Sequence, residues 1–147
     1  MTAPERPASV AKAKILIVDD HPIIRSGMRY LIGLEGDLEV CGEADSVQGA
    51  LACFDDLCPD LVLLDLSLPD GTGWDVIQHL RQHWLGTKIL VVSGWDRFNA
   101  TAAIEAGAMG FVSKHDANEK LIEAIRTVLN NQTYAAHSTT RGAGGRS

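Results

Sequence analysis

Three short stretches of this chain are apolar at every position, and they limit its fold more than any other feature. They read ILIV within residues 14–18, LVLL within residues 60–65 and ILVV within residues 88–93. A strand with one face in water alternates apolar and polar residues, whereas a strand buried on both faces does not. These runs therefore predict the central strands of a parallel sheet that is covered on both sides.

Helical patterns separate the predicted strands. Apolar residues recur at steps of three and four in the intervening segments, as the inner face of a helix requires. The segment 97–106 is rich in alanine and has Ile104 as its one large aliphatic residue, so we expect this helix to be held less firmly. The predicted strands are residues 14–18, 38–44, 60–65, 88–93 and 109–113, and the predicted helices are about residues 22–32, 47–54, 77–84, 97–106 and 121–129.

This alternation predicts an α/β fold with a doubly wound, five-stranded parallel sheet, because right-handed crossovers place helices on both faces. Ligands of such folds bind beyond the carboxyl ends of the strands. The 147 residues suffice for one domain of ordinary size. We take residues 14–131 as that domain, residues 1–13 as a flexible lead-in and residues 132–147 as a linker remnant or tail.

The composition argues against several classes of partner. Nineteen acidic residues against 13 basic ones give a net charge of −6, which disfavours a nucleic-acid-binding surface on this domain. No apolar run approaches the roughly 20 residues needed to cross a bilayer. The three cysteines are odd in number and lack metal-ligand spacing, so we expect free thiols in a reducing cytoplasm.

Polar side chains suited to metal and phosphate chemistry follow four of the five predicted strands. They are Asp19 and Asp20, Asp65, Ser93 and Lys114. Two carboxylates about 4 Å apart repel by roughly 4 kcal/mol at an effective dielectric constant of about 20. A divalent cation removes that repulsion, and Mg²⁺ prefers carboxylates, waters and a phosphate oxygen. A lysine and a hydroxyl would contact the remaining oxygens of a transferred phosphoryl group.

Each of these residues alone has an ordinary explanation. An aspartate at a strand end is usually a turn former or a helix cap, and a lone lysine is usually a surface charge. We interpret His21, which follows the acidic pair, as a residue that opens the first helix rather than as a metal ligand. The combination is specific, and the turn DLSLPDG at residues 65–71 strengthens it.

Four motifs extend the pattern: ILIVDDHP (15–22), LVLLDLSLPDGTGWD (61–75), VVSG (91–94) and AGAMGFVSK (106–114). With them, about residues 12–131 resemble the receiver domain of bacterial two-component response regulators. The resemblance implies a flavodoxin-like (βα)5 fold with strand order 2-1-3-4-5. The stretches DDHPIIRSGMR and AGAMGFVSK are also similar to the NarL/FixJ subfamily, whose members carry LuxR-type output domains.

The resemblance assigns roles to the residues that bind metal and accept phosphate. Asp65 would accept a phosphoryl group from a sensor histidine kinase. Mg²⁺ would be held by Asp20, Asp65 and the main-chain carbonyl of Ser67, with Asp19 acting indirectly or through a water. A homodimer would form on phosphorylation.

The same resemblance assigns switching roles. Ser93 matches the switch hydroxyl, Lys114 the phosphate-pairing lysine and Phe111 the switch aromatic residue. Gly94 and Trp95 directly follow Ser93, and from this position in the sequence we expect them at the mouth of the site, where the Trp95 indole would slow hydrolysis of the phosphate by excluding water. A position of Trp95 in solvent or in a dimer contact is the alternative.

Other classes of function remain to be weighed. Members of the subfamily usually continue into a DNA-binding helix-turn-helix, for which this chain leaves no room, so we expect an output domain absent from it. A stand-alone receiver that acts through protein–protein contacts is the alternative. A haloacid-dehalogenase-like phosphatase also uses a strand-end aspartate but needs an acidic residue two positions later, where this chain has Ser67. We therefore expect a cytoplasmic, self-phosphorylating switch rather than a turnover enzyme, with no membrane contact.

Overall fold

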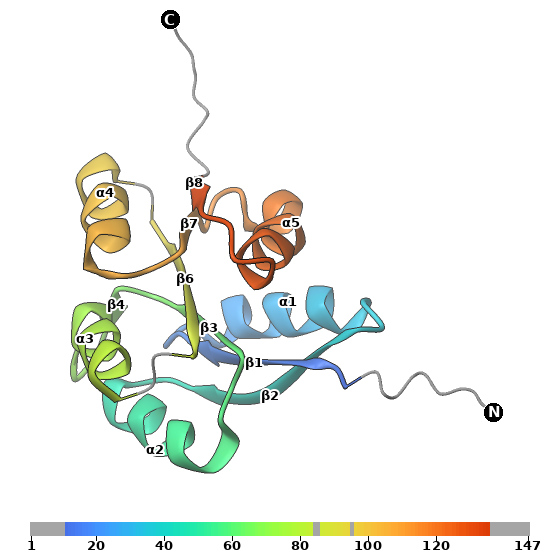
Figure 1. The fold of residues 1–147 in the computed structure, drawn as a ribbon, viewed down its shortest axis with the longest axis horizontal. Coiled ribbons are helices and arrows are strands. Elements are labelled where there is room, and N and C mark those ends of the chain that lie inside the picture. Colours follow the sequence, from blue (N-terminus) through green and yellow to red (C-terminus); the bar gives the residue numbers. More distant parts are fainter. Residues whose placement is uncertain (1–10, 84–85, 95, 136–147) are drawn as a thin grey trace, which may run out of the picture.

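In the part of the chain that the structure describes, five main strands and five helices alternate, as the sequence predicts (Figure 1). The structure is a computed structural model, and it describes residues 11–83, 86–94 and 96–135. The elements are β1 (Ala13–Val18), α1 (Pro22–Gly33), β2 (Leu38–Ala44), α2 (Val47–Leu57), β3 (Leu61–Leu64), β4 (Ser67–Leu68), β5 (Gly71–Thr72), α3 (Gly73–His83), β6 (Lys88–Ser93), α4 (Arg97–Ala106), β7 (Gly110–Ser113), α5 (Ala117–Leu129) and β8 (Tyr134–Ala135).

The main sheet is parallel throughout, with the order β2-β1-β3-β6-β7-β8. Its first five strands are the five predicted ones, so the predicted order 2-1-3-4-5 is confirmed. The sixth strand, β8, was not predicted. It pairs beside β7, with Tyr134 opposite Gly110, where a Cβ would stand 3.0 Å from the Tyr134 carbonyl oxygen. Glycine at this position lets the short strand approach. The rest of the predicted tail, residues 136–147, lies outside the described residues.

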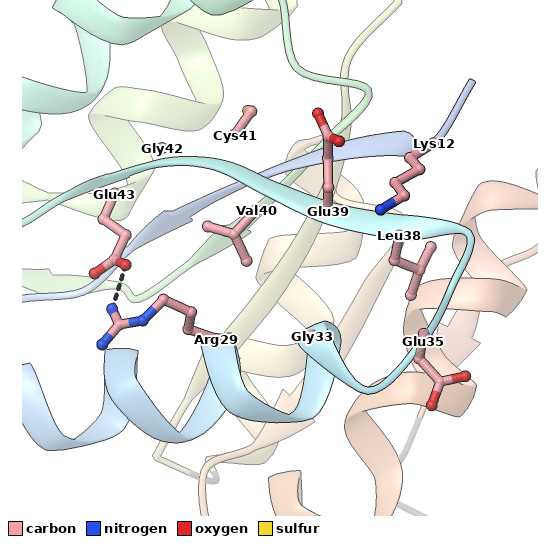
Figure 2. Close-up of a pocket in the computed structure, with 10 residues that line it drawn as sticks. All are labelled: Lys12, Arg29, Gly33, Glu35, Leu38, Glu39, Val40, Cys41, Gly42 and Glu43. Carbon is pink, nitrogen blue, oxygen red and sulfur yellow. Dashed lines mark hydrogen bonds and ion pairs between the residues drawn. The ribbon is translucent and has the colours of Figure 1, made fainter. Parts of the chain in front are cut away.

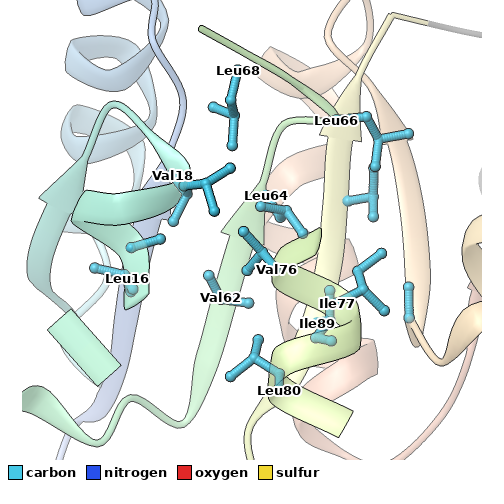
Figure 3. Close-up of a cluster of buried hydrophobic side chains, with 14 of the residues drawn as sticks. Leu16, Val18, Val62, Leu64, Leu66, Leu68, Val76, Ile77, Leu80 and Ile89 are labelled. Carbon is cyan, nitrogen blue, oxygen red and sulfur yellow. The ribbon is translucent and has the colours of Figure 1, made fainter. Parts of the chain in front are cut away.

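Two apolar clusters lie on opposite faces of the sheet. Leu16 and Val18 point to one face, into the same cluster as Val76 and Leu80 of α3 (Figure 3). Residues of α2, α3 and α4 cover this face. Ile15 and Ile17 point to the other face, which α1 and α5 cover. All four of these side chains are fully buried. The absence of alternation in the first strand therefore has the predicted cause, which is burial on both faces.

The start of α2 is fixed from two directions. Ser46 is its N-cap and accepts a hydrogen bond from the Gly49 amide at 2.9 Å. The Asp70 carboxylate, from the turn after β3, accepts hydrogen bonds from the amides of Val47 at 2.7 Å and Gln48 at 3.0 Å. These bonds, led by that from Gln48, lower the pKa of Asp70. The loop that follows Asp65 is thereby tied to a neighbouring helix.

The helix α4 is held by few buried groups. Ala103 is buried, Ile104 is half-buried and Phe98 is 78% exposed. The Arg81 guanidinium donates a hydrogen bond to the Ala106 carbonyl at 3.0 Å, which ties the end of α4 to α3. This sparse packing agrees with the expectation from the alanine-rich sequence. Among the described residues, no helix combines the length and apolar character that crossing a bilayer requires.

Candidate functional site

The carboxyl ends of four parallel strands bring the predicted polar residues to one edge of the sheet. Asp19 and Asp20 follow β1, Asp65 follows β3, Ser93 ends β6 and Lys114 follows β7. Asp19 and Asp65 are almost completely buried, at 1% and 2% exposed. Because burying a carboxylate is costly unless it is paired, these two groups need compensating contacts.

Both oxygens of the Asp65 carboxylate have partners. The Ser93 hydroxyl donates to Oδ1 at 2.9 Å, and the Ser67 amide donates to the same oxygen at 3.3 Å. Lys114 Nζ donates to Oδ2 at 2.9 Å. These contacts fix the orientation of the Asp65 carboxylate at the carboxyl edge of the sheet.

The chain turns back after Asp65, so that the main chain of Gly73 lies close to that of Asp65 and Leu66. The Gly73 amide donates to the Leu66 carbonyl at 2.9 Å. A Cβ at Gly73 would lie 2.5 Å from the main-chain oxygen of Asp65, closer than any real contact. Only glycine allows this approach, so the residue helps to position Asp65 without touching its side chain.

Lys114 lies between two buried carboxylates. Its Nζ is 2.9 Å from Asp19 Oδ2 and 2.9 Å from Asp65 Oδ2. Burial lowers the pKa of Lys114, but hydrogen bonds and charge attraction from Asp65 and Asp19 outweigh burial and raise it overall. The lysine is therefore charged at neutral pH and offsets part of the negative charge of the site.

The acidic residues and His21 form a cluster that could hold a metal ion. Ligand atoms of Asp19, Asp20, His21 and Asp65 all lie within 4.8 Å of one another. The buried Oδ1 of Asp20 receives no hydrogen bond from the described residues, and Oδ2 of Asp19 has only the ion pair with Lys114. A divalent cation would satisfy such oxygens, so the residues present fit the predicted ion. The predicted role of the Ser67 main-chain carbonyl as a metal ligand is not tested by the contacts of the described residues, and it stays a prediction.

The predicted switch residues already face inward. Ser93 is in contact with Asp65, and Phe111 on β7 is buried at 1% exposed in the cluster shared with α4. Gly94 is exposed, with open space around it, while Trp95 lies outside the described residues.

The side-chain direction of His21 was missed by sequence reasoning. The residue is the N-cap of α1, as its predicted place at the start of the first helix requires, but its ring makes no capping bond. Instead Nδ1 lies 2.7 Å from Asp19 Oδ1 and 3.1 Å from Asp20 Oδ1. The only sequence signal was the position of a histidine directly after two aspartates.

A groove elsewhere on the surface does not involve these residues. It has a volume of about 500 Å³ and lies between α1 and the edge strand β2 (Figure 2). Lys12, Arg29 and Glu43 are among its lining residues, and Arg29 pairs with Glu43 across it. None of Asp19, Asp65 and Lys114 lines it, so it is separate from the polar residues at the ends of the central strands.

Comparison with known proteins agrees with the geometry. The family model of the response regulator receiver domain matches residues 15–126. The chain belongs to this family. Among curated relatives, it is 35% identical over 130 residues to the DNA-binding transcriptional activator DevR/DosR of Mycobacterium tuberculosis, covering 84% of this chain and 60% of the relative. It is 32% identical over 130 residues to the nitrate/nitrite response regulator NarL of Escherichia coli, covering 87% of this chain and 60% of the relative.

Solved structures give the same assignment. A LuxR-family two-component response regulator from Aurantimonas sp. SI85-9A1 superposes with a TM-score of 0.79 at 34% identity, over 84% of this chain and 89% of that one. The signal receiver domain of NarL from Mycobacterium tuberculosis gives a TM-score of 0.77 at 30% identity, over 83% of this chain and 99% of that one. The chain is thus a receiver domain of the NarL/LuxR type, a signalling switch, and it spans about 60% of the length of these curated relatives.

Proposed function

We propose that this receiver domain stores a signal as a phosphoryl group on Asp65, delivered by a sensor histidine kinase. The observation that carries the proposal is the pairing of both Asp65 oxygens, with Ser93 on one and Lys114 on the other. These are the two groups that a phosphoryl group on this carboxylate would need around its own oxygens. The acidic cluster beside them provides room for a divalent ion.

In the proposed transfer, an Asp65 oxygen attacks the phosphorus of a phosphohistidine. A phosphorus–oxygen bond forms, the phosphorus–nitrogen bond breaks, and its electron pair returns to the imidazole of the kinase. A bound Mg²⁺, held by Asp20, Asp65 and the Ser67 carbonyl, with Asp19 acting indirectly, would supply positive charge beside the phosphoryl oxygens. Lys114 moves its ion pair from the carboxylate to a phosphoryl oxygen, and Ser93 donates its hydroxyl to another.

The output is proposed to be a change of the surface formed by α4, β7 and α5. The phosphoryl group would hold Ser93 at the end of β6, a short loop before α4, and keep Phe111 buried in the cluster shared with that helix. Because the side chains already have this arrangement, phosphorylation would stabilise it rather than create it. A homodimer formed on this change is the expected consequence.

DNA control is proposed for the larger protein. Relatives are named as transcriptional regulators, one of them as a DNA-binding activator. We infer that a helix-turn-helix domain outside this chain binds DNA, and that the receiver itself does not. The alternative is a receiver that acts alone through protein contacts. In either case we propose a cytoplasmic switch that accepts and loses its own phosphoryl group and does not hydrolyse a separate substrate. A phosphatase of the haloacid-dehalogenase type would need an acidic residue at the position of Ser67.

The test is phosphorylation by acetyl phosphate in the presence of Mg²⁺, followed by intact mass measurement. We expect one added phosphoryl group on the wild type and none on Asp65→Asn. Asp55→Asn, which changes an exposed aspartate on α2, is the matched control and should be labelled like the wild type. Undiminished labelling of Asp65→Asn would overturn the proposal.

A further inference from the structure

The imidazole of His21 reaches into the acidic cluster rather than into solvent. Its Nδ1 lies 2.7 Å from Asp19 Oδ1, 3.1 Å from Asp20 Oδ1 and 3.8 Å from Asp65 Oδ2. The side chain as a whole is 55% exposed, but its Nδ1 points inward toward the aspartates. Three carboxylate oxygens from two strand ends thus surround one ring nitrogen.

Hydrogen bonds alone do not satisfy this arrangement. Lys114 Nζ, which can only donate, lies 3.1 Å from the same Nδ1 and requires a lone pair there. Asp19 Oδ1, which can only accept, requires a proton there. One nitrogen cannot meet both demands, while the buried Asp20 Oδ1 receives no hydrogen bond from the described residues.

The spacing is that of neighbouring ligands around one ion. Ligand atoms bound at about 2.1 Å and at right angles to each other lie about 3 Å apart. The 2.7 Å and 3.1 Å separations from Nδ1 to the two aspartates match this value. The histidine is also held in place, because its own amide donates to Asp19 Oδ1 at 2.8 Å and Pro22 follows it.

We propose that His21 is a nitrogen ligand of the divalent-ion site and shifts its preference from Mg²⁺ toward borderline transition metals such as Co²⁺. Imidazole nitrogen favours transition metals, whereas sites built only of oxygen favour Mg²⁺. The inference rests on the metal site of the proposed function and names a residue that sets its specificity. The sequence interpretation of His21 as a helix-opening residue describes its backbone only.

The first readout is binding, measured by titration calorimetry at pH 8 with Mg²⁺ alone and with Co²⁺ alone. We expect His21→Ala to weaken Co²⁺ binding by roughly tenfold and Mg²⁺ binding by less than about threefold. His21→Asn, which keeps a polar N-cap, should behave in the same way. His83→Ala, which removes an exposed histidine on α3, should bind both ions at this site like the wild type.

The second readout is spectroscopic and does not depend on affinity. Electron spin echo modulation of bound Mn²⁺ should show a coupled nitrogen in the wild type and in His83→Ala, and none in His21→Ala. The variant Asp20→Asn distinguishes failure of the proposed metal site from failure of the proposed role of His21. If it leaves the binding of both ions unchanged, the metal site itself is wrong. If it weakens binding while His21→Ala retains wild-type Co²⁺ affinity and the nitrogen coupling, only the role of His21 is overturned.

Discussion

The helices α4 and α5 flank the same strand, β7, yet they are attached to the molecule in different ways. On α5, Leu121, Ala124, Ile125 and Val128 are fully buried against the sheet. On α4, Ala103 is buried, and the aromatic ring of Phe98 stands in solvent. One helix is part of the core, and the other rests on it.

The difference indicates where the fold can change at low cost. Burying apolar surface contributes about 25 cal/mol per Å², so a helix that buries four side chains resists displacement more than one that buries a single alanine. Segments with few buried contacts open and shift most easily. Because α4 follows Ser93 in the chain, and Ser93 contacts Asp65, the loosely packed helix is also the one next to the proposed phosphoacceptor. In the proposed switch, α4 is therefore the part that we expect to move and α5 the part that we expect to stay fixed.

The strongest test of the comparison removes one large side chain from each helix. Ile125→Ala should lower the free energy of unfolding by about 2–5 kcal/mol, because it opens a cavity in the core. Ile104→Ala removes a half-buried side chain of α4 and should lower the free energy of unfolding by about 1 kcal/mol or less. Urea unfolding of both variants measures the difference. Equal losses would show that the two helices are equally anchored.

A smaller effect is expected from the link between α3 and α4. Arg81→Met removes the hydrogen bond to the Ala106 carbonyl, with an expected cost of about 0.5–1 kcal/mol. The informative readout is hydrogen exchange, which should accelerate at the C-terminal amides of α4 and stay unchanged in α5. Faster exchange spread evenly over both helices would contradict this reading of Arg81.

The smallest effect is expected from the ion pair between Arg126 of α5 and Asp37. Hydrogen bonding to Arg126 holds the pKa of Asp37 below its ordinary value, at distances of 2.7 Å and 3.0 Å. A lowered pKa in the folded state stabilises the fold above the unfolded value of about 3.9. That contribution is lost as the pH falls through the folded value.

The stability difference between the wild type and Arg126→Met should therefore be present at pH 6 and vanish on acidification. The effect of Arg81→Met provides the control, since its acceptor is a main-chain carbonyl that does not titrate. Urea midpoints measured from pH 6 down to pH 3 compare the two variants. A difference for Arg126→Met that persists unchanged into acid would rule out the ion pair as its source.

Much of the fold could be predicted because burial on both faces leaves a mark in the sequence. The runs at residues 14–18 and 60–65 have no polar alternation, and both strands are buried as expected. The two-residue strand β8 left no such mark, because its position depends on pairing with Gly110. The hairpin of β4 and β5 is also too short to form a periodic pattern.

In the candidate site, too, some features could be predicted from the sequence and others could not. The convergence of Asp65, Ser93 and Lys114 could be predicted, since parallel strands bring their carboxyl ends to one edge. The direction of the His21 ring could not, because a helix N-cap position does not determine where a side chain points. The hydrogen bonds that Asp70 accepts from α2 join residues 22 and 23 positions apart, and no local pattern indicates them.

The most direct test of the central claim is hydrogen exchange with and without beryllofluoride, in the presence of Mg²⁺. Beryllofluoride would stand in for the phosphoryl group that we propose on Asp65. We expect increased protection in α4 and β7 of the wild type, little change in α1 and α2, and no response in Asp65→Asn. Protection changes confined to α1 and α2, or an equal response in Asp65→Asn, would contradict the account.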